Sequence, residues 1–564
     1  MVLQGGAWEV YADRLGSEKG SFGAYSNLKQ DSQEGYFEQA LAQGRADGAT
    51  FIDSAALQKF YAQRDNYPYW TGTPGVRGRA DALRETLKAS WKHGLNPHSY
   101  HLDSIDSLWG ATGIQEQGTL ELLLSDAFVR YVRDLSGIRV DPSKLRSGSE
   151  YWRKAPEASE VLEMLSGRQR IQDILRAVEP KGATYKAMQA ELVRLSTAPE
   201  EPYAAILPID FDGALMRPGW RHKSVPALRV RLGVQPQTQD EKLYDDRLAA
   251  AVMRFQRDNG LEPDAIIGST TLQMLNQTNQ KRIMQLIANM ERLRWVPEDK
   301  PDRFVVVNIP SATLWAIDKG RVRFEMPVIV GSPARPTSSF ITQIEGVRFN
   351  PDWTVPSTIK RFDILPKIQA EPDYLQNKGI EIIKGYGEAA RTLDPASINW
   401  ATISAAELNS LRMVQIPGEH NPLGRIRILM PNKYNIYLHD TNHPEYFEKA
   451  ARAVSSGCIR LYNPEKMASF IMEGRSGWRG EDMRAVLETL NTTDIEIQNY
   501  IPVYVLYYTA WLDENGRVIY GPDIYKQDQK LLKMLSNLDA LYIPVDNNHQ
   551  KAQDLRPASL VSAR

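Results

Sequence analysis

One cysteine and one histidine in the C-terminal half of the chain have the types and spacing of a nucleophile and its base. Cys458 is the only cysteine among the 564 residues, so it cannot form a disulfide within the chain. It ends the run Ser455-Ser456-Gly457-Cys458, and His439 lies nineteen positions earlier. A thiol with a histidine to take its proton can attack a carbonyl carbon. A lone cysteine is also often a small buried hydrophobe, so its surroundings must decide.

The flanking segments predict a rigid frame for both residues. Residues 433–438 are rich in aromatic and branched side chains and predict a buried strand that delivers His439 at its end. Residues 463–465 (Asn-Pro-Glu) predict the start of a helix. Cys458 is therefore expected on a loop shortly before a helix. A glycine lets such a loop adopt backbone angles that other residues disfavour. The backbone N–H groups of Ser456, Gly457 and Cys458 are then expected to point at one oxyanion and stabilise it.

This pattern resembles the signature of the L,D-transpeptidase (YkuD-type) family. The signature is a histidine, a spacer, and then Ser/Thr-His-Gly-Cys, often followed by Ile-Arg. The matching positions are His439, Ser455, Gly457, Cys458 and Arg460. Ser456 departs, because the family usually has histidine there. That histidine mainly lends its backbone N–H, so the departure leaves His439 as the only motif histidine able to act as a base.

Upstream segments look like elements of the same catalytic domain. They are residues 304–310, 314–315, 326–331, 350–356 and 421–424. The resemblance covers roughly residues 300 to 510 and implies a mostly β catalytic domain at 301–510. A long insertion at about 354–420 resembles the capping subdomain of large members, which covers the active site. Helical patterns are predicted within it at 371–383 and 404–411.

The resemblance also implies a reaction. Cys458 would be the nucleophile and His439 the general base and then acid, with a backbone carbonyl near Asp440 orienting the imidazole. A neighbouring imidazolium would lower the pKa of the thiol. The donor would be a peptidoglycan tetrapeptide, attacked at the L-centre of its third residue, a diamino acid. D-Ala would leave, and the side-chain amine of a neighbouring stem would resolve the thioester into a 3→3 cross-link. Carbapenems acylate family members, and neither a cofactor nor a metal is implied.

Four further residues are candidates for binding the substrate. Arg460 is expected either to bind a stem carboxylate or to form a structural ion pair that supports the cysteine loop. Tyr437 and Trp353 either line the donor groove or pack in the core. Asp440 adjoins the catalytic histidine. Two other function classes stay open, namely an L,D-carboxypeptidase, in which water resolves the thioester, and a peptidoglycan-binding scaffold with an inert thiol.

Length and composition limit the remaining possibilities. The chain is 42% hydrophobic, enough for packed cores, and its formal net charge of −1 gives no bulk attraction to nucleic acid. No apolar run is long enough to span a bilayer, and the nearest one, 501–512, has the composition of a strand. The first residues do not form a signal peptide. The family resemblance implies a periplasmic protein; we expect a monomer whose export signal or membrane tether has been removed from this sequence.

The rest of the chain predicts a multidomain α+β protein. Residues 31–215 are mainly helical and resemble the scaffold domain of large family members of the YcbB type. Residues 220–280 resemble a three-helix peptidoglycan-binding repeat, and 281–300 form a connecting helix. Residues 511–564 are expected to return to the scaffold and end in a polar tail from 546. The basic residues of the repeat either face an anionic glycopeptide or form a solvated surface; they are 221–223, Arg229 and Arg231.

Two rival motifs have the wrong context. His439 and His443 have the spacing of a zincin pair, but that motif needs a helix, and here a strand is predicted and Pro444 follows. Ser357-Thr-Ile-Lys360 matches the Ser-x-x-Lys of penicillin-binding proteins, but no Ser-Asp-Asn or Lys-Thr-Gly accompanies it.

Overall fold

The computed structural model describes residues 30–543, apart from 73, 199–208, 260, 386, 450, 474 and 476. The polar tail expected from 546 lies outside these residues. The described residues of 30–84, 101–129 and 158–171 form one compact unit, and the other described residues form a second. None of the described helices is long and apolar enough to cross a membrane.

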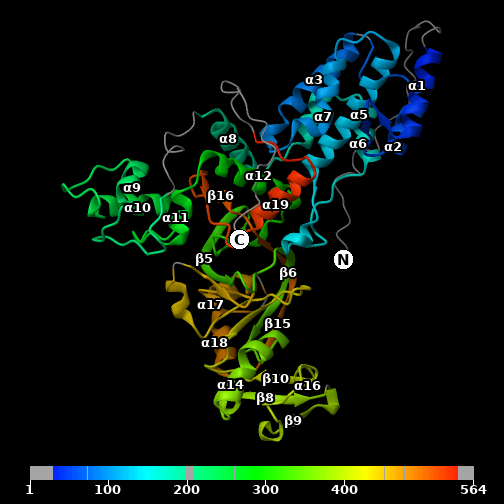
Figure 1. Cartoon of the computed structure of the whole chain (residues 1–564). Helices are drawn as coiled ribbons and strands as arrows, with labels where there is room; N and C mark the ends of the chain where they lie inside the picture. The colour runs from blue at the N-terminus through cyan, green and yellow to red at the C-terminus, as the bar shows by residue number, and fades with distance from the viewer. Residues whose placement is uncertain are drawn as a thin grey trace. The chain divides into compact units, whose positions relative to one another are not determined.

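The N-terminal part is helical, as predicted. Its main helices are α1 (Gln30–Gln43), α2 (Ser54–Ala62), α3 (Pro74–Lys88), α4 (Leu102–Leu108), α5 (Ile114–Ser136), α6 (Ala158–Glu163), α7 (Ile171–Val178) and α8 (Ala183–Thr197) (Figure 1). Along α5, apolar residues three and four apart are fully buried, which is why this segment is a helix; they include Leu124, Phe128, Tyr131 and Leu135.

Three short helices follow with a core of their own. They are α9 (Val225–Leu232), α10 (Asp246–Asp258) and α11 (Ser269–Leu275). The basic residues of this region have structural partners. Arg229 is buried and pairs with Asp245 at 2.6 Å, while Arg221 pairs with Asp240 and Lys223 with Asp212. Arg229 is therefore a core residue and does not face a glycopeptide.

Helix α12 (Asn279–Trp295) precedes the β domain, and the C-terminal elements pack against it. It is the connecting helix predicted at 281–300, and its apolar residues Ile283, Leu286, Ile287 and Met290 are buried. Strands β16 (Ala510–Leu512) and β17 (Val518–Tyr520) form an antiparallel hairpin. Helix α19 (Gln527–Asn537) packs on α12, and the Arg292 guanidinium reaches the Asp528 carboxylate at 2.5 Å.

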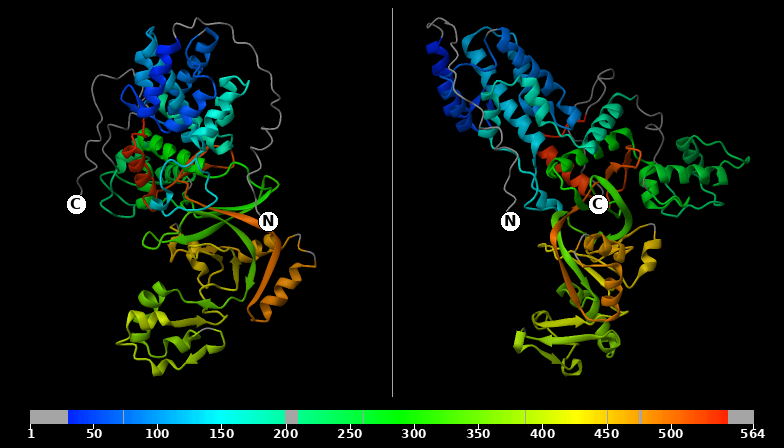
Figure 2. Two further views of the ribbon diagram at one scale, coloured as in Figure 1. Left: turned by 90° about the vertical axis from the view of Figure 1, so that its right-hand side faces the viewer. Right: turned by 180° about the vertical axis from the view of Figure 1, so that it is seen from behind.

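The catalytic candidates lie in one mixed sheet of nine strands. The strands are β3 (Arg303–Asn308), β4 (Thr313–Asp318), β5 (Arg321–Gly331), β6 (Phe340–Phe349), β11 (Ile426–Leu429), β12 (Leu438–His439), β13 (Ala453–Ser455), β14 (Ile459–Leu461) and β15 (Thr493–Leu506). Their order is β13-β5-β14-β12-β11-β6-β15-β3-β4, and the sheet closes because β5 also pairs with β4. Figure 2 shows β15 in orange alongside β6 in green.

Strict alternation gives the central strands two different faces. One face contributes to the main core and is covered by α17 (Pro464–Met472). Its buried residues include Val347, Phe349, Ile426, Ile428, Leu438, Ile459 and Leu461. The residues between them point the other way because successive side chains in a strand alternate. That second face carries Arg348, Arg427, His439 and Arg460.

The insertion folds as a small subdomain around a separate core. Its four-stranded sheet has the order β7-β10-β8-β9, built from β7 (Trp353–Thr354), β8 (Ile380–Lys384), β9 (Arg391–Leu393) and β10 (Leu411–Gln415). Helices α13 (Ser357–Ile359), α14 (Leu365–Ala370), α15 (Tyr374–Asn377) and α16 (Ala405–Ser410) accompany it. The helix predicted at 371–383 is wrong: α15 is one turn long, and Ile380 and Ile382 alternate into the core as strand residues.

Candidate active site

Strand register brings the predicted nucleophile and base to one face of the sheet. Strand β12 lies between β11 and β14, with Arg427 opposite His439 on one side and Arg460 opposite His439 on the other. Leu438 faces Ile459 across the parallel pair, so Cys458 stands at the level of Tyr437. Since residues two apart share a face, Cys458 and His439 project from neighbouring strands to the same side.

His439 is held with one nitrogen free. The side chain is buried, with 4% of its surface exposed, and its Nδ1 lies 2.5 Å from the backbone oxygen of Asp440. A carbonyl can only accept a hydrogen bond, so Nδ1 carries the proton and Nε2 keeps its lone pair. Burial, the Arg460 charge and the Arg427 charge lower the pKa of His439 to about 3, although the bond to Asp440 opposes them. The resting imidazole is therefore neutral and can accept a proton.

Cys458 is half-buried, and its thiol is protonated at rest. Its Sγ lies 3.7 Å from the backbone oxygen of Asn435, to which it donates. Burial raises the pKa of Cys458, while a backbone hydrogen bond from Tyr437 and the charges of Arg460 and Arg427 partly oppose that rise. The expected imidazolium–thiolate pair is thus not the resting state. Burial disfavours both charged forms, so a nucleophilic attack by this sulfur would require the thiol to lose its proton during the attack.

The Ser455 hydroxyl holds the cysteine loop together through two hydrogen bonds within the loop. The Ser455 hydroxyl donates to the backbone oxygen of Cys458 at 2.6 Å and accepts from the Gly457 amide at 3.1 Å. Gly457 has φ +118°, a left-handed angle that side chains disfavour. Because the Gly457 amide is already bonded, it does not fit the predicted oxyanion role. The amides of Ser456 and Cys458 remain the candidates.

The loop is also supported from outside by residues that the sequence did not reveal. Thr337 is buried; its hydroxyl donates to the Gly457 oxygen and accepts from the Gly331 amide, both at 2.8 Å. The Tyr525 hydroxyl donates to the Gly331 oxygen and accepts from the Thr337 amide. A residue almost seventy positions beyond the cysteine therefore fixes the strand end on which the loop rests, and no local motif marks it.

One ion pair connects the cysteine loop with the inserted subdomain. The Arg335 guanidinium lies 2.6 Å from the Asp363 carboxylate of the insertion and donates to the Ser456 hydroxyl at 3.1 Å. After His439, the Asn442 amide donates to the backbone oxygen of His420, at the other end of the insertion. These contacts were missed because all of their partners are distant in sequence.

The structure separates the four predicted substrate residues. The Asp440 carboxylate accepts from the backbone amides of Arg425 and Thr441, so it shapes the site and is not directed at a substrate. Trp353 packs against the core of the insertion. Tyr437 packs at the edge of the main core, with the Arg427 guanidinium 4.6 Å from its ring centre. Arg460 forms no ion pair with a described carboxylate, and it donates to the Thr441 hydroxyl.

The rival motifs have structural roles. His443 pairs with Glu445 at 2.9 Å and stacks on Tyr446. The Lys360 ammonium is buried and donates to the backbone oxygens of Leu408 and Leu411. Neither residue takes part in the arrangement around Cys458.

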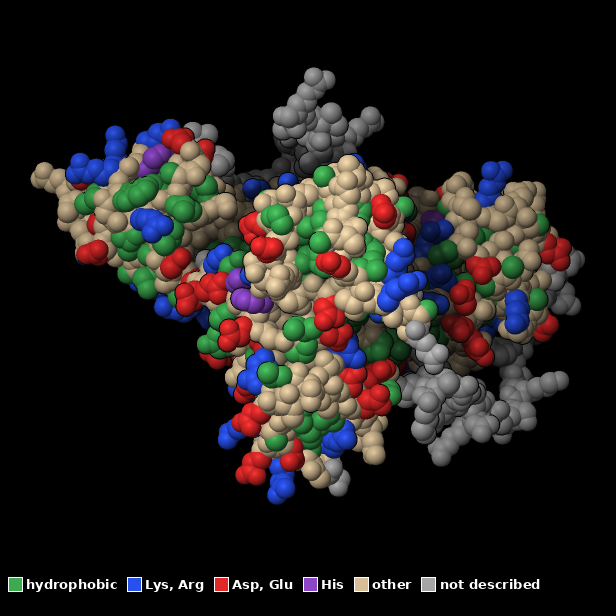
Figure 3. All heavy atoms as spheres, turned by 90° about the horizontal axis from the view of Figure 1, so that it is seen from below, with side chains coloured by type: hydrophobic (Ala, Val, Ile, Leu, Met, Phe, Trp, Pro, Cys, Tyr) green, Lys and Arg blue, Asp and Glu red, His purple; other side chains and the backbone are tan. Residues whose placement is uncertain are grey.

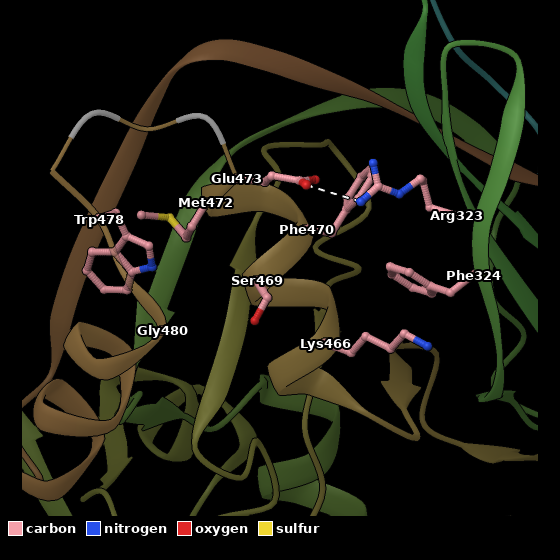
Figure 4. Close-up of a pocket in the computed structure, with 9 residues that line it drawn as sticks. All are labelled: Arg323, Phe324, Lys466, Ser469, Phe470, Met472, Glu473, Trp478 and Gly480. Carbon is pink, nitrogen blue, oxygen red and sulfur yellow. Dashed lines mark hydrogen bonds and ion pairs between the residues drawn. The ribbon is translucent and has the colours of Figure 1, made fainter.

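One hollow of the described structure lies away from the candidate catalytic residues. It has a volume of about 510 Å³ and is lined by residues of α17, among them Lys466 and Ser469, and by Phe324 and Trp478 outside that helix. Figure 4 shows the Arg323–Glu473 ion pair at its rim. Neither Cys458 nor His439 lines it. On the face drawn in Figure 3, acidic and basic side chains are interspersed, as the net charge of −1 leads one to expect.

A loop thiol on the same sheet face as a neutral imidazole that a carbonyl orients is suited to acyl transfer through sulfur. Comparison with known families agrees. Residues 302–497 match the L,D-transpeptidase catalytic domain, residues 55–192 the scaffold domain, and residues 230–275 the family described as "Putative peptidoglycan binding domain". The chain therefore carries an L,D-transpeptidase catalytic domain of YkuD type with a scaffold domain and a peptidoglycan-binding domain, which confirms the resemblance.

Individual relatives cover parts of the chain. A protein of Haemophilus influenzae named "Putative L,D-transpeptidase" is 34% identical over 255 residues, which are 45% of this chain. The alignment spans 50% of that protein. An L,D-transpeptidase structure from Mycobacterium smegmatis shares 13% identity over 36% of this chain and 58% of its own, with a TM-score of 0.19. An L,D-transpeptidase structure from Stackebrandtia nassauensis shares 13% sequence identity over 54% of this chain and 97% of its own, with a TM-score of 0.17.

Proposed function

We propose that this protein is a cysteine-dependent L,D-transpeptidase that links peptidoglycan stem peptides through a thioester on Cys458. The observation that carries the proposal is the arrangement of His439. Its Nδ1 proton is held by the Asp440 carbonyl, and its basic nitrogen is free on the face that also presents Cys458. The peptidoglycan-binding family match at 230–275 supports a substrate in the cell envelope, which for this chain would be the periplasm.

Acylation requires one proton transfer. His439 Nε2 takes the thiol proton as the Cys458 sulfur attacks the carbonyl at the L-centre of the third residue of the donor stem. Negative charge develops on the carbonyl oxygen, where the Ser456 and Cys458 amides would stabilise it. The C–N bond then breaks, the D-Ala amine takes the proton from His439, and a thioester remains.

The second half of the reaction reverses the proton's path. The side-chain amine of a neighbouring stem attacks the thioester carbonyl and gives a proton to His439. The C–S bond breaks, the sulfur regains the proton, and a 3→3 cross-link is formed. We further propose that the inserted subdomain holds the acceptor and excludes water, because Arg335 ties it to the cysteine loop through Asp363.

A carbapenem titration followed by mass measurement tests the nucleophile. The intact protein should gain one adduct, and Cys458→Ala should gain none while keeping its fold. His439→Ala should slow acylation by about 10²- to 10⁴-fold, the usual contribution of a general base. His443→Ala is the matched control, since this exposed histidine contacts Glu445 and Tyr446 and not the catalytic candidates, and the variant should be acylated at the normal rate. An adduct on Cys458→Ala excludes the thioester.

Products from muropeptides separate the alternatives. Cross-linked dimers identify a transferase, whereas tripeptides alone identify an L,D-carboxypeptidase. A chain that gives neither product and no carbapenem adduct would be a peptidoglycan-binding scaffold with an inert thiol.

A further inference from the structure

A row of charged side chains crosses five neighbouring strands at the level of His439. The register pairs Asp494 of β15 with Arg348 of β6, Arg348 with Arg427 of β11, Arg427 with His439, and His439 with Arg460 of β14. Residues directly opposite each other on paired strands project to the same face. The row therefore lies on the face that carries the thiol, and three of its five members are arginines.

The charges of this row are balanced at one end only. Arg348 forms a two-pronged ion pair with Asp494, with both N–O distances 2.6 Å, and it also reaches Asp352 at 3.4 Å. No carboxylate of the described chain lies within ion-pair distance of Arg427 or Arg460. The two cations nearest the catalytic pair are thus the ones without a counter-charge.

The charge of Arg427 lowers the stability of the folded protein when no ligand is bound. It is half-buried, its buried Nε has no hydrogen-bond partner, and its guanidinium rests on the Tyr437 ring. Burial and the nearby Arg348 charge lower the pKa of Arg427. A cation taken out of water without a partner is destabilising. An anionic ligand would remove that cost, and a guanidinium fork matches a carboxylate in particular.

We propose that Arg427 acts with Arg460 to bind a carboxylate of the donor peptide and thereby selects the donor. The inference rests on the proposed function and extends it, because the sequence pointed to Arg460 alone. The two arginines flank His439 on the strands on either side of β12, so their backbones are two strand spacings, about 9.6 Å, apart and their long side chains can converge on one anion. The carboxylate carbon of the leaving residue is separated from the attacked carbonyl carbon by two backbone atoms, about 4 Å in all. An anion bound by both arginines would lie on the sheet face that also presents Cys458.

Two carboxylates of the donor could occupy this position. One is the C-terminal carboxylate of the leaving residue, and the other is the free carboxylate on the side chain of the diamino acid. Three tetrapeptides distinguish them: the free acid, its C-terminal carboxamide, and a form amidated at the diamino acid. Binding is measured calorimetrically to full-length Cys458→Ala protein, so that chemistry cannot intervene.

The free acid should bind about 10- to 100-fold more tightly than one of the two amides, as a charge-assisted hydrogen bond of about 1.5–3 kcal/mol implies. Adding Arg427→Gln should remove most of that ratio, because it should weaken the binding of the free acid and leave the affinity for the amide unchanged. That unchanged affinity also shows that the variant is folded. Arg321→Gln is the matched control, because Arg321 is an exposed arginine of β5, and it should keep the full ratio.

Three results would overturn the inference: no preference of the parent protein for the acid over either amide, no measurable binding of the acid, or a full preference that persists in the Arg427 variant. These results are separable from a failure of the proposed function. If wild-type protein makes dimers but the Cys458→Ala protein binds the acid and both amides equally, the role of Arg427 alone is refuted. Wild-type protein that makes neither dimers nor a carbapenem adduct refutes the function itself.

Discussion

Two groups of buried arginines in this protein have opposite surroundings. Around Glu291, which is fully buried, the guanidinium groups of Arg139 and Arg294 lie 2.7 and 2.5 Å from one carboxylate oxygen, and Trp295 donates to the other. Around His439, Arg427 and Arg460 lie beside the site with no described carboxylate partner. We call the first group closed, because its two cations share the Glu291 carboxylate, and the second group open, because no described carboxylate pairs with its cations.

The difference separates stability from function. A buried cation with a carboxylate partner fixes the packing of its neighbours, and removing one member leaves an uncompensated charge. A buried cation without a partner adds no such stability to the free protein. Such a cation is suited to bind an anion that the folded chain does not itself contain. The predictions below test that contrast.

Methionine substitutions in the two groups should have opposite effects on the free energy of unfolding. Arg294→Met leaves Glu291 with a single guanidinium partner in a buried site and should destabilise the protein by about 3–5 kcal/mol. Arg427→Met removes a charge that has no partner and keeps an apolar stem against Tyr437, so stability should stay the same or rise by about 1 kcal/mol. Denaturant unfolding with a probe in the catalytic unit measures both.

If Arg294→Met and Arg427→Met destabilise the protein equally, the proposed difference between the two groups is wrong, because Arg427 would then have a stabilising partner in the free protein. The exposed Arg321→Met substitution provides the baseline, with an expected change within about 0.5 kcal/mol.

The closed group should be sensitive to acid. Burial opposes ionisation of Glu291, but Arg139 and Arg294 outweigh it and hold its pKa at about 2, below the ordinary 4.5. Because the folded pKa is the lower one, the stability that it contributes is complete above about pH 4.5 and is lost as the pH falls towards 2. The thermal midpoint of Glu291→Gln should lie below that of the parent at pH 7, and the gap should narrow in this window.

The matched control for acid sensitivity is Glu298→Gln. The Glu298–Arg153 ion pair spans 3.8 Å and is partly exposed. The thermal midpoints of Glu298→Gln and the parent should therefore differ little at every pH. A gap for Glu291→Gln that stays constant from pH 7 to 3 would contradict the predicted linkage.

The open group should be visible in the reactivity of the thiol. Since the pKa of Cys458 is raised and that of His439 is lowered to about 3, alkylation by iodoacetamide should accelerate continuously above pH 7 with no inflection near 6.5. Arg427→Met removes a charge that favours the thiolate and should move the curve to higher pH. The single cysteine makes the adduct unambiguous by mass. A flat rate from pH 5 to 8 would instead indicate a preformed thiolate–imidazolium pair.

The sequence was informative where one short segment carries the signal. The run Ser455 to Cys458 with His439 upstream predicted the nucleophile and its base, and the helical character predicted for 31–215 and 281–300 is seen in α5 and α12. Residues 371–383 misled, because alternate apolar residues at the end of a short helix continue as strand β8. The oxyanion prediction failed at Gly457, since only the folded loop shows that Ser455 occupies its amide.

The sequence by itself therefore determined the family and the helical or strand character of most segments, and it supplied the candidate pair Cys458 and His439, because these depend on short sequence patterns. Tertiary structure alone decided which arginines lack partners. Arg427 belongs to an ordinary alternating strand, and its meaning appears only when register sets it opposite His439. The protonation states were decided in the same way, because burial and distant charges, not the residue types, place the pKa of a thiol and an imidazole.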